Sequence, residues 1–139
     1  MKLVKFALIA AAIVAAPLTP AVLAGATDPL FVNLLTNDAH RARMAVVFST
    51  NQLERGHPVT FFFNDKGVVL LSKKNAKKFG EHQKLLGEAM KKGAQVIACP
   101  MCMKHYGVNQ GDLIDGVKVG TPELTGGALF KDNTKTLTW

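Results

Sequence analysis

Two cysteines mark the segment of this chain whose residue types and spacing indicate chemistry. Cys99 and Cys102 lie in the run CPMCMKHY, which spans residues 99–106 and directly follows a short apolar stretch. Pro100 suits the first position of a helix, so Cys99 is predicted to be the N-cap, with the free amide N–H groups of the helix directed at its sulfur. Those amides and the helix dipole favour a thiolate, so we expect the pKa of Cys99 to fall below about 8.5, the value of a free cysteine.

Cys102 follows Cys99 by one helical turn and can reach it to close a disulfide. We therefore interpret Cys99 as a nucleophile and Cys102 as its partner. The alternative is that both are merely small buried apolar residues.

A rival hypothesis is a soft-metal site in the same segment. The residue types that suit Cu(I) are Cys99, Met101, Cys102, Met103 and His105. Helical spacing weakens this hypothesis, because Met101 and Met103 would project to other faces of the helix than Cys99. His105, three residues after Cys102, could share its face as a ligand or a base, or could be a partly exposed structural histidine. The metal assignment stays open, and no cofactor is predicted.

Apolar runs alternate with amphipathic segments along the chain. Runs at 30–36, 59–63 and 94–98 predict three strands, and two shorter segments at 117–120 and 136–139 predict a fourth and a fifth. The second run lacks alternation, which is typical of a strand covered on both faces.

Two helices are predicted between the first three strands. One spans 38–55, with Asp38 as N-cap and Gly56 as its stop, and the other spans about 76–92 and ends at Gly93. This order predicts a single-domain α/β three-layer sandwich with a mostly parallel sheet of about five strands. Functional residues gather at the carboxyl edge of such sheets, which is where the cysteines fall.

The first 24 residues are predicted to be a signal peptide. Lys2 and Lys5 precede an uncharged run over residues 6–16, which is too short to span a bilayer. The alternative is an N-terminal membrane anchor that is never cut.

Small or short residues at the positions that a signal peptidase recognises predict cleavage after Ala24 or Ala26, with a domain over residues 27–139. The mature chain is then expected in the periplasm without stable membrane insertion. Thiols can oxidise there and persist as disulfides.

The composition is basic, with 17 lysines and arginines against 10 acidic residues and a net charge of +7 in 139 residues. Several lysines surround the second predicted helix: Lys73, Lys74, Lys77, Lys78, Lys84, Lys91 and Lys92. Nucleic-acid binding would need aromatic or groove-reading partners, and only Phe79 lies among them. We therefore predict a solvated face and no nucleic-acid partner, although such lysines can raise the local concentration of small anionic sulfur compounds.

A run of four apolar residues, 68–71, falls outside the predicted helices and strands. Such a run is costly to expose, so we expect this loop to pack against a subunit partner in a homo-oligomer.

Four segments together resemble the DsrE/DsrF-like family. They are LFVNLLT at 30–36, LERGHPV at 53–59 leading into three phenylalanines, GAQV at 93–96, and Cys99 followed eight residues later by Gly107-Val108. The sulfur-relay subunits of that family carry persulfide sulfur on one cysteine after the third strand, which Cys99 matches. A branch associated with selenium and sulfur metabolism is similar in having a Cys-x-x-Cys motif, as in Cys99 and Cys102.

The resemblance implies a small α/β sandwich that forms trimers or hexamers. It also implies a persulfide carrier or sulfurtransferase-like role for Cys99, with a sulfur donor or acceptor protein or a small anionic sulfur compound as partner. The predicted export departs from the cytoplasmic relay subunits, and Cys102 stands where those subunits have a small residue. The alternative function is a periplasmic thiol-disulfide redox or Cu(I)-binding protein that uses the same two cysteines.

Overall fold

The computed structural model describes Gly25 and residues 27–139, and within them five strands form one parallel sheet in the order β4-β3-β2-β1-β5. The strands are β1 (Leu30–Leu34), β2 (Val59–Phe63), β3 (Gln95–Ala98), β4 (Lys118–Val119) and β5 (Lys135–Thr138). The helices are α1 (Ala39–Glu54), α2 (Ala76–Lys91), α3 (Pro100–His105) and α4 (Pro122–Leu129), with short 3-10 segments η1 (Asp65–Leu71), η2 (Lys73–Asn75) and η3 (Gln110–Asp112). The predicted α/β class is confirmed. The predicted signal peptide and both cleavage positions lie outside the described residues.

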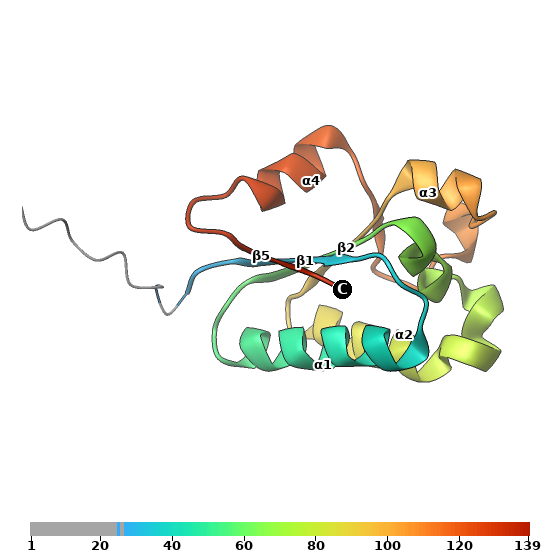
Figure 1. Cartoon of the computed structure of the whole chain (residues 1–139), viewed down its shortest axis with the longest axis horizontal. Helices are drawn as coiled ribbons and strands as arrows, with labels where there is room; N and C mark the ends of the chain where they lie inside the picture. The colour runs from blue at the N-terminus through green and yellow to red at the C-terminus, as the bar shows by residue number, and fades with distance from the viewer. Residues whose placement is uncertain (1–24, 26) are drawn as a thin grey trace, which may run out of the picture.

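Helices cover both faces of the sheet, which gives three layers. Helices α1 and α2 lie together on one face, and α3 and α4 lie on the other (Figure 1). The chain steps from β1 to β2 to β3 through α1 and α2, then returns through α4 to place β5 beside β1. Because all of these strand pairs are parallel, their carboxyl ends meet at one edge of the sheet.

The sequence signals at the ends of α1 and α2 act as predicted. The Asp38 side chain accepts a hydrogen bond of 2.8 Å from the backbone N–H of Arg41, which satisfies one of the free amides at the start of α1. Beyond the ends of the two helices, Gly56 and Gly93 have φ angles of 97° and 101°, a conformation in which glycine has no steric cost. Both predicted helices are thereby confirmed.

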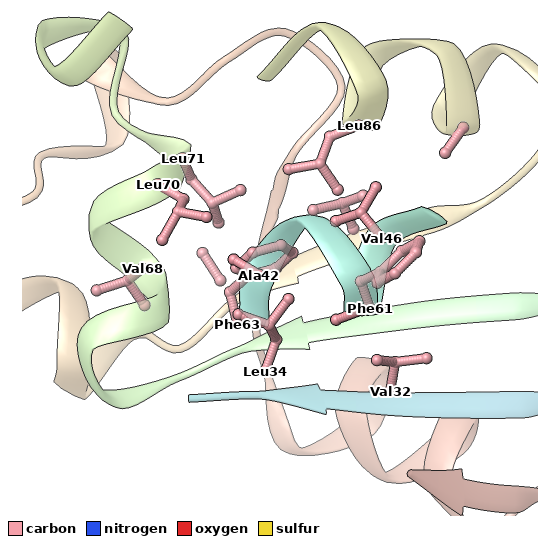
Figure 2. Close-up of a cluster of buried hydrophobic side chains, with 14 of the residues drawn as sticks. Val32, Leu34, Ala42, Val46, Phe61, Phe63, Val68, Leu70, Leu71 and Leu86 are labelled. Carbon is pink, nitrogen blue, oxygen red and sulfur yellow. The ribbon is translucent and has the colours of Figure 1, made fainter. Parts of the chain in front are cut away.

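The main core lies between the sheet and the α1–α2 layer, and η1 closes one end of it. The side chains of Val32, Leu34, Phe61 and Phe63 alternate toward this core along β1 and β2. Figure 2 shows them packed with residues from α1, α2 and η1.

The expectation that run 68–71 packs against a subunit partner is wrong. Val68, Leu70 and Leu71 belong to η1 and are fully buried in the core of their own domain, near Leu34 and Phe63 (Figure 2). The 3-10 conformation turns three of the four apolar side chains inward, and only Val69 remains half-buried. The predicted homo-oligomer therefore loses one of its two grounds and rests on the family resemblance alone.

Helix α4 was not predicted from the sequence, although its start carries a recognisable signal. The Thr121 side chain accepts from the Leu124 N–H at 3.1 Å, and Pro122 occupies the first helical position. No residue of α4 is fully buried. A helix that buries so little needs no strong apolar stripe, which is why helical spacing did not reveal α4. Among the helices of the described residues, none combines the length and the apolar character that a membrane span requires.

Candidate functional site

Cys99 joins the end of β3 to the start of α3, as predicted. Its backbone N–H donates to the carbonyl of Phe63 at 2.9 Å, which ties the end of β3 to the end of β2. Its own carbonyl accepts from the Met103 N–H at 2.9 Å, the first hydrogen bond of the helix. With Pro100 at the first helical position, Cys99 is the N-cap. The backbone hydrogen bond between the two strand ends therefore fixes the position of Cys99 at the edge of the sheet.

The expected contact between the Cys99 sulfur and the helix amides is not formed. The Cys99 side chain accepts no capping hydrogen bond. Pro100 has no N–H, and sulfur is a weaker acceptor than the oxygen of the usual N-cap residues. The sequence predicted that the amides of α3 would stabilise a Cys99 thiolate directly, and this prediction is wrong because no such hydrogen bond forms. Its role as a nucleophile stays a prediction.

Cys102 receives the amide contact instead. The backbone N–H of Asp65, at the start of η1, donates to the Cys102 sulfur at 3.1 Å. Both cysteines are free and half-buried. Burial raises the pKa of the Cys102 thiol, and a hydrogen bond with the Cys99 thiol raises it further, whereas the Asp65 N–H acts in the opposite direction. The net effect favours the protonated form of Cys102.

Asp65 also contacts α3 through its carboxylate, which accepts a hydrogen bond from the Tyr106 hydroxyl. This hydrogen bond is the main reason why the pKa of Tyr106 lies above its usual value. Neither residue was assigned to the site from the sequence. The available signal was the position of Asp65 two residues after the second strand, because adjacent parallel strands end at the same edge of the sheet.

A surface pocket of about 460 Å³ opens beside Cys102. Its lining comes from the end of β2, the start of η1, and α3 with its C-cap: Phe62, Asn64, Asp65, Met101, Cys102, His105 and Tyr106. Cys99 does not belong to this lining. A small molecule or an extended peptide segment in the pocket would therefore meet Cys102 before Cys99.

The soft-ligand residues of the CPMCMKHY segment are divided by the fold. Met103 is 5% exposed and belongs to the core, whereas Met101 is 81% exposed and lines the pocket with His105. The His105 ring is exposed and meets the Tyr106 ring edge to face, with 4.7 Å between centroids. In the part of the chain that the structure describes, no group of three or more His, Cys, Asp or Glu residues could hold a metal ion. Of the five residues that could have bound Cu(I), only Met101, Cys102 and His105 line the same pocket.

The lysine cluster forms an exposed face, as predicted. Lys73, Lys74 and Lys92 pair with Asp115, Asp112 and Glu54. The other lysines of the cluster, Lys77, Lys78, Lys84 and Lys91, are exposed along α2.

Cys99 is expected to react faster than Cys102 with iodoacetamide near neutral pH. Burial holds Cys102 as a thiol, and only the thiolate is alkylated, so the labelling of Cys102 should rise at a higher pH than that of a free cysteine. The pH profiles of the Cys102→Ser and Cys99→Ser proteins would measure each thiol alone. Equal rates, both with an inflection at the pH of a free cysteine, would contradict this assignment of roles.

The fold and the site define a class of protein: a small α/β domain that presents two thiols at the carboxyl edge of a parallel sheet. Residues 30–132 match the model of the DsrE/DsrF-like family, so the chain belongs to that family. Two curated relatives are uncharacterised proteins of Methanopyrus kandleri and Methanocaldococcus jannaschii. Each is 34% identical over 82 residues, which is 58% of this chain and 68% or 72% of the relative.

Solved structures share the fold. The ychN protein of E. coli has a TM-score of 0.67 at 20% identity, with 81% of this chain and 99% of that one covered. A protein from Methanobacterium thermoautotrophicum has a TM-score of 0.64 at 16% identity, with 80% and 98% covered. A protein from Bacteroides thetaiotaomicron has a TM-score of 0.64 at 19% identity, with 81% and 95% covered. At these identities the likeness concerns the fold alone.

Proposed function

We propose that this protein handles sulfur through a reactive cysteine, with Cys99 carrying sulfur as a persulfide and Cys102 as its partner thiol. One observation carries the proposal: two free thiols lie one helical turn apart at the carboxyl edge of the sheet, and burial favours the protonated form of one of them. Membership of the DsrE/DsrF-like family, which relates the chain to sulfur-relay proteins, supports it.

The different environments of the two cysteines support different roles. A thiolate is the nucleophile in sulfur transfer, and burial disfavours that form of Cys102. Cys99 is then the sulfur acceptor, in a carrier or a sulfurtransferase-like protein. The partner is a sulfur donor or acceptor protein or a small anionic sulfur compound. The exposed lysines of α2 would attract such an anion, and the effect would weaken with added salt.

Location and assembly complete the proposal. A signal peptide over residues 1–24 would place the mature protein in the periplasm, where it works as a homo-oligomer, a trimer or a hexamer.

Intact-mass analysis tests the function. The purified mature protein would be weighed before and after exposure to a low-molecular-weight persulfide and, separately, to Cu(I). We expect the mass of one added sulfur atom per chain after the persulfide, because one thiolate accepts one sulfur. A Cys102→Ser protein that takes up no sulfur, or a wild-type protein that binds copper tightly and takes up no sulfur, would contradict the proposal in favour of a redox or a metal-binding role.

A further inference from the structure

Asp65 has an unusual backbone conformation at the edge of the candidate site. Its φ is 44°, and among the described residues only one other residue besides glycine, Asn133, has a positive φ. Residues with side chains adopt this left-handed region at a steric cost, so the surrounding structure must hold it in place. Here the holding structure is η1, which begins at Asp65 and whose apolar side chains are buried in the core.

This conformation directs the Asp65 backbone N–H at the sulfur of Cys102, 37 positions along the chain, at 3.1 Å. The same residue accepts a hydrogen bond from the Tyr106 hydroxyl through its carboxylate, so two hydrogen bonds join Asp65 to α3 and its C-terminal cap. The two groups of Asp65 act in opposite directions. The N–H favours a thiolate on Cys102 and is the stronger of the two influences, whereas the carboxylate disfavours the thiolate.

Cys102 can remove a persulfide from Cys99, because its thiolate can displace the outer sulfur. The Cys102 thiolate attacks the Cys99 sulfur, its electron pair forms the new S–S bond, and the bond to the outer sulfur breaks. The outer sulfur leaves as hydrosulfide with the electrons of the broken bond and the proton that it already carries. The products are a Cys99–Cys102 disulfide and one hydrosulfide ion, and no further reductant is needed for this single turnover.

We propose that Asp65 is a positioning residue whose backbone N–H holds the Cys102 sulfur against η1, and that its carboxylate slows the attack of Cys102 on sulfur carried by Cys99. This inference rests on the proposed function. The carboxylate keeps negative charge beside Cys102, and the carried sulfur survives until an acceptor arrives. Besides Cys102, the titratable and charged residues of η1, of α3 and of its caps are Asp65, Lys66, Cys99, Lys104, His105 and Tyr106, and of these Asp65 and Cys99 act on Cys102.

The Asp65→Asn change tests the role of the charge. Asparagine tolerates the left-handed conformation and keeps the backbone N–H, but it removes the negative charge. After loading with glutathione persulfide and removal of the excess, we expect hydrosulfide release to be faster than in the wild type, because the lost carboxylate charge no longer disfavours the Cys102 thiolate. The release should also begin at lower pH. Asp115→Asn, which changes an exposed aspartate paired with Lys73, is the matched control and should match the wild type.

Tyr106→Phe separates a charge effect from a structural one. It leaves the Asp65 charge unshared, so release should be equal to or slower than in the wild type. A merely structural role would loosen the contact between η1 and α3 in both variants, and both would then release sulfur faster. Wild-type release in Asp65→Asn, or accelerated release in Tyr106→Phe, would overturn the inference.

A second measurement does not depend on sulfur uptake. In the Cys99→Ser protein, the pH profile of Cys102 alkylation would be recorded with and without Asp65→Asn. A profile shifted to lower pH by Asp65→Asn supports the role of Asp65 even if no variant takes up sulfur, and in that case only the proposed function fails. An unchanged profile overturns the role of Asp65 and leaves the proposed function standing.

Discussion

Sulfur uptake is expected to be lost in the Cys99→Ser protein and retained in the Cys102→Ser protein. A persulfide is bonded to one sulfur atom, so a carrier needs Cys99 above all other residues. Cys102→Ser also removes the thiol that discharges the persulfide, so the adduct should persist longer than in the wild type. Each variant would be loaded with a persulfide donor and weighed over time.

The same pair of variants distinguishes sulfur handling from copper binding. Copper would be shared between ligands, so a Cu(I) site should weaken markedly when either thiolate is removed. Met103 is buried in the core, and Met101 and His105, the other soft ligands that line the pocket with Cys102, supply no thiolate in its place. Tight copper binding that needs both cysteines, with no sulfur adduct on any variant, would replace the persulfide carrier by a metal-binding protein.

Gly67→Ala is expected to destabilise the fold by about 1–3 kcal/mol, the usual cost of forcing extra atoms into a packed site. A Cβ at Gly67 would lie 2.2 Å from the carbonyl oxygen of Leu34, which is a backbone atom at the end of β1 and cannot rotate away. The Gly67 N–H donates to the Leu35 carbonyl at 3.0 Å, so η1 is tied to this position. Urea unfolding of the purified variant would measure the change.

Gly80→Ala provides the matched control for this substitution. Gly80 lies inside α2, and a Cβ there would meet no atom within 4 Å. Alanine is the better helix former, so this variant should gain about 0.5–1 kcal/mol. If Gly67→Ala proved as stable as the wild type, the close contact between η1 and the end of β1 would be wrong.

The sequence by itself determined the local elements and the class of the fold. Apolar runs predicted all five strands, and helical spacing with Asp38, Gly56 and Gly93 predicted α1 and α2. These signals are local, since a cap or a positive φ depends on a few neighbouring residues. Pro100 likewise predicted that Cys99 would cap α3. The resemblance to the DsrE/DsrF-like family also came from the sequence, and the family match confirmed it.

The tertiary structure alone decided what surrounds the thiols and where run 68–71 packs. The Asp65 contacts with Cys102 and Tyr106 join residues 37 and 41 positions apart, and they exist because β2 lies beside β3 in the sheet. No local pattern encodes that strand order, or the turn after β2 that buries Leu70 and Leu71 in their own domain. Sequence spacing predicted amide donors of α3 at the Cys99 sulfur, a contact that is not formed, whereas strand pairing brought a donor from η1 to Cys102. A hydrogen bond between residues so far apart in the chain depends on tertiary packing, which no short segment of the sequence encodes.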